Sequence, residues 1–120
     1  LIPFINGAFK LNGKTKMASA VMPYYTISWN QDKVDNENIA NNYNKYLITD
    51  LLRKKYNYNG VVCTDWLVTG DHRAMDNFID GKSWGVEHLS IVERHYKVLM
   101  AGVDQFGGNK NESKNGTECR

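Results

Sequence analysis

Residues 60–66, Gly-Val-Val-Cys-Thr-Asp-Trp, form the stretch of sequence that decides the fold. Val61 and Val62 are strong strand formers without polar alternation, which is typical of a strand buried on both faces. Asp65 and Trp66 follow at the carboxyl end, where parallel α/β proteins place their binding sites. The stretch therefore predicts a central parallel strand with a candidate site at its exit.

A helix is expected on each side of this strand. Apolar residues recur at helical spacing over residues 39–56 and again over residues 84–100. Two further short apolar runs, at residues 18–25 and 101–106, are predicted to be strands. The connections are too long for hairpins, so the order predicts parallel strands joined by helical crossovers and an α/β fold.

Length and composition narrow the class of protein. A chain of 120 residues is one domain at most, and its 42% hydrophobic and 23% charged residues exclude wholesale disorder. The net charge of +2 is too small to favour a nucleic acid or an anionic membrane as partner. No apolar run approaches the roughly 18 residues of a membrane helix. No cofactor is expected.

Asp65 is the sharpest functional candidate. A carboxylate at the end of a buried strand loses hydration, so it needs hydrogen-bond partners or a function. The alternatives are a helix N-cap or an ordinary loop carboxylate for Asp65, and plain core packing for Trp66. A metal site formed by Asp65, Asp71 and His72 is a further hypothesis, although their spacing matches no strong motif.

Four segments together resemble glycoside hydrolase family 3, in order and in spacing: residues 20–25, 44–53, 58–66 and 101–104. The resemblance covers about residues 1–108. It implies that these residues are the C-terminal part of the catalytic barrel domain of that family. The expected fold is then a partial TIM-type (β/α)8 barrel, with about three parallel strands and two crossover helices.

The resemblance implies a retaining β-glycosidase, and within the family a β-glucosidase that hydrolyses terminal β-linked glucosyl residues. It implies that Asp65 is the nucleophile and that Trp66 is a wall of the sugar site. It also implies that Tyr25 hydrogen-bonds near the nucleophile and that Met22 is an apolar contact lining the same pocket. The substrate would be an oligosaccharide or a β-glucoside, attacked through a covalent glycosyl-enzyme.

Other features depart from the family pattern. The acid/base of the glucosidase-like branch lies in another domain, so the remainder of a parent chain is expected to supply it. Residues 109–120 are expected to be a disordered or non-homologous tail. The short length, the start at Leu1 and the lack of a signal peptide lead us to expect a fragment that is inactive alone.

Two alternatives to an active glycosidase stay open at this stage. One is an inactive carbohydrate-binding or structural remnant of the same fold, and the other is a metal-dependent hydrolase on an α/β scaffold. Family resemblance alone favours a periplasmic or secreted location.

Overall fold

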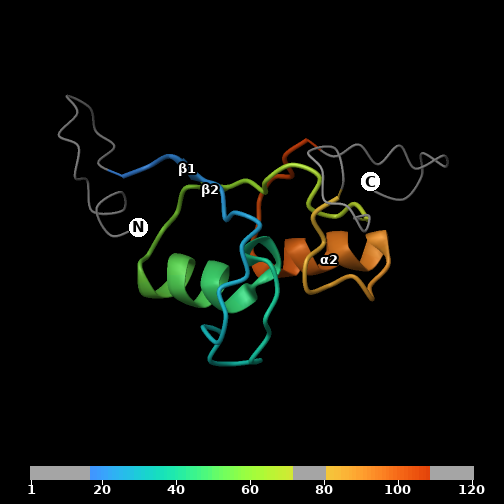
Figure 1. Cartoon of the computed structure of the whole chain (residues 1–120). Coiled ribbons are helices and arrows are strands. Elements are labelled where there is room, and N and C mark those ends of the chain that lie inside the picture. The colour runs from blue at the N-terminus through green and yellow to red at the C-terminus, as the bar shows by residue number, and fades with distance from the viewer. Residues whose placement is uncertain (1–16, 72–80, 109–120) are drawn as a thin grey trace.

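The computed structural model describes residues 17–71 and 81–108 of the chain. Their elements follow in the order β1 (Ala20–Val21), η1 (Asn41–Tyr43), η2 (Tyr46–Lys55), β2 (Val61–Val62) and α2 (Ile91–Ala101). The two longer helices, η2 and α2, lie on the same side of the strand pair (Figure 1). No helix among these residues has both the length and the apolar character that crossing a membrane requires.

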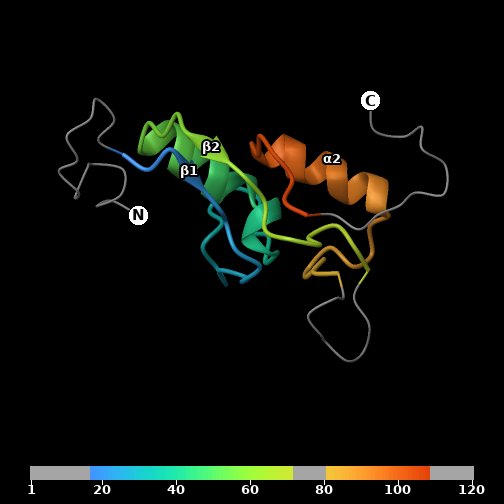
Figure 2. The same ribbon diagram turned by 90° about the horizontal axis from the view of Figure 1, so that it is seen from above.

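The two strands pair in parallel, with Ala20 opposite Val61, and Figure 2 shows them side by side. The predicted parallel pairing is therefore confirmed, but the first strand is much shorter than the predicted residues 18–25. Pro23 has no N–H for a ladder hydrogen bond, and Tyr24 has a positive φ of 41°. The chain consequently leaves the sheet soon after β1.

The strand predicted at residues 101–106 is reduced to a single parallel bridge between Cys63 and Gln105. Ala101 instead ends α2, and Gly102 closes that helix in the left-handed conformation with φ 105°. The structure thus confirms an α/β unit with parallel pairing. A pair of strands and one further parallel bridge do not by themselves define a barrel.

The helix predicted over residues 39–56 is two helices in the structure. Asn44 has an extended backbone between them, and its Oδ1 accepts the N–H of Leu47 in the first turn of η2 at 3.0 Å. The η2 segment is a π-helix, and it closes with the N–H of Tyr56 donating to the carbonyl of Leu51 at 2.9 Å. The apolar stripe runs across the break, so periodicity alone predicted one continuous helix.

In the turn after η2, Asn57 and not Gly60 is the residue with positive φ, at 53°. Gly60 is needed for a different reason, because a Cβ there would collide with Tyr58 and with the Ser19 carbonyl. Glycine therefore allows the chain to pass closely beside the start of β1.

The second helix begins at Ile91 and not at residue 84 as predicted. Ser90 Oγ accepts the N–H of Glu93 at 3.3 Å, and the Glu93 carboxylate accepts the N–H of Ser90 at 2.8 Å. This reciprocal pair is a capping box, whose Ser-x-x-Glu signature marks a helix start. The apolar pattern over residues 84–89 belongs to turns that cover the core.

The hydrophobic core is formed where the strand pair meets the helices. Of the apolar residues predicted to form the first stripe, Ile39, Tyr43, Ile48 and Leu52 are buried there, whereas the others are partly exposed. The buried apolar residues of this core are Ile39, Ala40, Tyr43, Ile48, Leu52, Tyr58, Val62, Val68, Val86, Val98, Ala101 and Val103.

Arg53 and Asp104 join the start of β2 to both longer helices. The Arg53 guanidinium donates to the carbonyls of Gly60, before β2, and of Gly102, after α2, each at 2.8 Å. It also pairs with Asp104 at 2.5 Å, whose carboxylate accepts the N–H of Val62 at 2.8 Å. Asp104 therefore has a structural role, and Arg53 is tied to the backbone on both sides of it.

Replacing Asp104 by Asn is expected to lower stability at neutral pH and to have little effect in acid. The N–H of Val62, working against partial burial, and the Arg53 guanidinium hold the pKa of Asp104 below its usual value. A carboxylate with a lowered folded-state pKa stabilises the fold above its unfolded-state pKa, about 4, and loses that contribution as the pH falls. The side chain is half exposed, so we expect a loss of about 1 kcal/mol at pH 7.

Denaturant unfolding of the wild-type chain and of Asp104→Asn at pH 7 and at pH 3 checks this expectation. A stability difference of the same size at both pH values would contradict it.

Candidate active site

Parallel pairing brings the exits of β1 and β2 to the same edge of the structure (Figure 2). Tyr25 follows β1, whereas Asp65 and Trp66 follow β2. The Tyr25 hydroxyl donates a hydrogen bond to the Trp66 carbonyl at 2.5 Å. Three of the four side chains predicted from the sequence thus lie together at the strand exits.

Asp65 is partly exposed at this edge. Its Oδ1 accepts the N–H of Trp66 at 2.9 Å, and its own N–H donates to Oδ1 of Asn42 at 3.2 Å. Turns at residues 66–69 follow it, and no helix begins there, so the N-cap alternative is wrong. The Asp65 carboxylate is thus oriented by the backbone N–H of the next residue and is still accessible, as a nucleophile must be.

Tyr25 supplies a permanent hydroxyl next to this carboxylate. Burial raises the pKa of Tyr25 to about 12, and hydrogen bonding with Asp65 and the charge of Asp65 add to the rise. The hydroxyl therefore stays protonated across the neutral range. It can donate a hydrogen bond at the site, but it cannot serve there as a general base.

Trp66 presents an open aromatic surface, because 61% of the residue is exposed. The core-packing alternative for Trp66 is therefore wrong. Gly108 lies against the six-membered part of the indole, where a Cβ would collide with the ring. The N–H of Leu67 donates to the Gly108 carbonyl at 2.8 Å and holds the two segments together. An indole supported in this way offers a flat apolar surface for a sugar ring.

Met22 does not join the other three residues. It is 52% exposed and lines a groove of about 560 Å³ between β1 and η2. Leu47, Leu51 and Tyr56 line the same groove, and its lining does not include the site around Asp65. In this structure Met22 therefore lines the groove beside η2 and not the pocket around Asp65 in which its apolar contact was expected.

Two residues of the site were missed in the sequence. Trp84, which was assigned to a predicted helix, packs edge-on against Tyr25 with ring centroids 6.1 Å apart. Asn42 is fully buried, and its Nδ2 donates to the Tyr24 carbonyl at 3.0 Å. The sequence did not single out Asn42, because its hydrogen-bond partners lie far from it along the chain.

The loop after the site is held by Arg94, which is only 3% exposed. Its guanidinium donates to the carbonyls of Thr69, Val86 and Glu87 at 2.8–3.2 Å, and it pairs with Asp71 at 2.6 Å. The ion pair gives Asp71 a structural partner, which weakens the hypothesis of a metal site with Asp65. The third member of that hypothesis, at position 72, lies outside the described residues.

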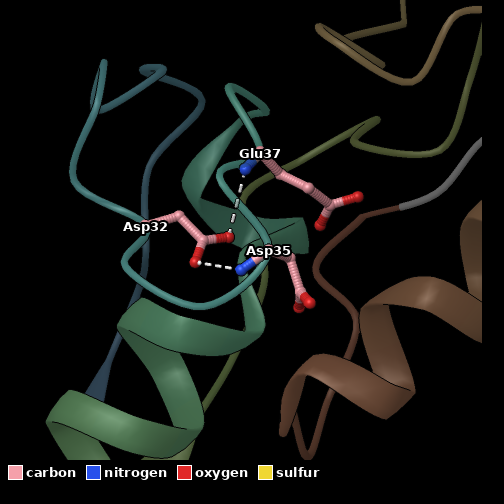
Figure 3. A group of neighbouring side chains, drawn as sticks. All are labelled: Asp32, Asp35 and Glu37. Atoms are coloured by element: carbon pink, nitrogen blue, oxygen red, sulfur yellow. Dashed lines mark hydrogen bonds between the residues drawn. The ribbon is translucent and has the colours of Figure 1, made fainter.

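A second acidic cluster, formed by Asp32, Asp35 and Glu37, lies in the loop before η1, with one carboxylate oxygen of each within 4.8 Å of the others (Figure 3). Burial opposes ionisation of Asp32, but hydrogen bonds from four backbone N–H groups outweigh it and hold its pKa below the usual value. Glu37 pairs with Lys97 at 2.7 Å. These contacts give Asp32 and Glu37 roles in the fold.

The fold and the site thus define a chain of the α/β class with a carboxylate, a hydroxyl donor and an exposed indole at parallel strand exits. No family model matches the chain. It is 38% identical over 119 residues to "Periplasmic beta-glucosidase/beta-xylosidase" of Dickeya chrysanthemi, an alignment that covers 88% of the chain and 17% of that protein.

Two fungal proteins give similar matches. The chain is 36% identical over 97 residues to "Beta-glucosidase C" of Emericella nidulans and 37% identical over 93 residues to "Probable beta-glucosidase C" of Aspergillus flavus. Each alignment covers 78% of the chain but only 15% and 14% of the respective relative. The resemblance to β-glucosidases is confirmed, and the chain spans about one sixth of the length of the relatives it matches.

Proposed function

We propose that residues 1–108 form the C-terminal part of the catalytic barrel domain of a retaining β-glycosidase of glycoside hydrolase family 3. Its activity is that of a β-glucosidase on terminal β-linked glucosyl residues. The observation that carries this proposal is the partly exposed Asp65 carboxylate beside the Tyr25 hydroxyl, in a chain 36–38% identical to proteins named β-glucosidases.

In this reaction the Asp65 carboxylate attacks the anomeric carbon of the glucosyl residue. A bond forms between the carboxylate oxygen and that carbon, while the bond from the carbon to the leaving-group oxygen breaks. A second carboxyl group, supplied by the remainder of the parent polypeptide, protonates the leaving oxygen. The same group then takes a proton from water, and that water releases glucose and restores Asp65.

Tyr25 and Trp66 assist without changing covalently. The Tyr25 hydroxyl keeps its proton and can donate a hydrogen bond to the carboxylate or to a sugar oxygen as charge moves during attack. The exposed indole of Trp66 provides a surface on which the sugar ring can stack. Both residues thus orient the reacting groups, which lowers the barrier by proximity.

Covalent trapping tests the proposal. The full natural polypeptide that carries this sequence is treated with an activated 2-deoxy-2-fluoro-β-glucoside, and peptide mass mapping locates the adduct. The fluorine slows both the formation and the hydrolysis of the glycosyl-enzyme, whereas the reactive leaving group speeds its formation. The glycosyl-enzyme therefore accumulates. We expect an adduct on Asp65.

An adduct on another residue of a hydrolysing protein would overturn the assignment of Asp65. Failure to hydrolyse or trap either the glucoside or the matching xyloside would instead favour an inactive remnant of the fold.

A further inference from the structure

A single buried side chain, that of Asn42 in η1, joins the exits of the two parallel strands. It is 0% exposed. Its Oδ1 accepts the N–H of Asp65 at 3.2 Å, and its Nδ2 donates to the Tyr24 carbonyl at 3.0 Å. One amide group therefore holds the backbone of the candidate nucleophile and the backbone directly before Tyr25.

The sheet itself does not extend to this point. Among the described residues, the last backbone hydrogen bond between the two strand segments runs from the N–H of Cys63 to the Val21 carbonyl at 3.0 Å. Tyr24 then turns away from the strand with its positive φ. Beyond the ladder, the two exits are joined by the Asn42 amide and by the Tyr25 hydroxyl on the Trp66 carbonyl.

The chemistry of the amide suits this place. An asparagine offers an acceptor and a donor on one rigid group, and both are used here in a fully buried position. Alanine would remove both contacts and leave the Asp65 N–H and the Tyr24 carbonyl without this partner. Aspartate would keep the acceptor for Asp65 but would lose the donor for Tyr24.

We propose that Asn42 is a positioning residue for the reaction of Asp65. It sets where the Asp65 backbone lies relative to Tyr25, and it acts through these residues without contacting the substrate. This inference rests on the proposed function. Asn42 affects the rate through the position of Asp65, because a displacement of about 1 Å at a reacting group can lower a rate by about 10²-fold.

Asn44 offers a matched control on the same segment. It is also buried, and its Oδ1 accepts the N–H of Leu47 at the start of η2. Both Asn42→Ala and Asn44→Ala therefore remove a buried amide and lower stability. Only Asn42 has hydrogen bonds to the strand exits.

The test compares the two variants in the full natural polypeptide, with rates expressed per folded molecule. For Asn42→Ala we expect kcat on a β-glucoside and the rate of trapping on Asp65 to fall by about 10²-fold, with KM changed by no more than about twofold. For Asn44→Ala we expect both rates near the wild-type values despite a lower melting temperature. Equal rates for the two variants would overturn the positioning role.

Asn42→Asp keeps the size of the side chain and provides a second readout if the alanine variant does not fold. The added carboxylate opposes negative charge on Asp65, so the acidic limb of the pH–rate profile should move to higher pH. An unmoved limb with an unchanged kcat would contradict the inference. A wild-type protein that neither hydrolyses β-glucosides nor forms an adduct would overturn the proposed function itself, and the role of Asn42 with it.

Discussion

Asp65→Ala in the full natural polypeptide is expected to abolish β-glucoside hydrolysis, with kcat falling by about 10⁴-fold or more. Asp65 is the carboxylate at the strand exits that lies beside Tyr25 and Trp66. Without it no glycosyl-enzyme can form, and the remaining groups only bind and orient the sugar. Hydrolysis of a chromogenic β-glucoside, measured over hours, gives the loss.

Chemical rescue separates a lost nucleophile from a damaged fold. Alanine leaves space for a small anion, so azide should attack the anomeric carbon from the position of the missing carboxylate. A single displacement inverts the centre, and the expected product is the α-glucosyl azide, identified by NMR.

The control is Asp71→Ala, which removes a carboxylate from the same loop. Asp71 is 74% exposed and pairs with Arg94, so we expect less than about a tenfold loss in kcat. A rate for Asp65→Ala as high as that of Asp71→Ala would show that Asp65 is not the nucleophile.

Arg94→Met is expected to lower the free energy of unfolding by about 4 kcal/mol. The guanidinium of Arg94 is buried and donates to three backbone carbonyls, two of them on the buried residues Thr69 and Val86. Methionine fills similar space but removes every one of these charged donors, so the three carbonyls lose these hydrogen bonds. Denaturant unfolding of the chain measures the difference.

Two companion variants identify the cause of this loss. Arg94→Lys keeps the charge but lacks the planar fork that reaches three carbonyls, so most of the loss should persist. Asp71→Asn removes the exposed ion pair alone and should cost about 1 kcal/mol or less. An Arg94→Lys variant as stable as the wild type would show that charge, and not geometry, holds the loop.

Much of the fold could be predicted from local pattern. The apolar run at Val61 and Val62 is a strand, its partner near Val21 is parallel, and the stripe containing Ile48 and Leu52 is helical and buried. The strand and the helix follow from the apolar pattern of their own segments, and the parallel pairing follows from connections too long for hairpins. The Ser-x-x-Glu signature at Ser90 would also have corrected the start of α2.

The element boundaries were harder to predict, for physical reasons that can be named. Asn44 separates the two helices with an extended backbone, and its side chain bonds the first turn of η2, yet the apolar stripe continues on both sides of it. The third strand shrinks to one bridge at Gln105 because Gly102 ends α2 only three residues earlier. The apolar pattern of a segment does not show where a helix ends relative to the strand that follows it.

By itself, the sequence determined the α/β order, the positions of Asp65 and Trp66 at a strand exit, and the likeness to β-glucosidases. The tertiary structure alone decided that Tyr25 reaches the Trp66 carbonyl across 41 positions, and that Asn42 reaches the Asp65 backbone across 23. Periodicity reports which face of a segment is apolar, whereas these hydrogen bonds exist only once distant segments have packed. Tertiary packing therefore determines which side chains meet at the candidate site and at what distances.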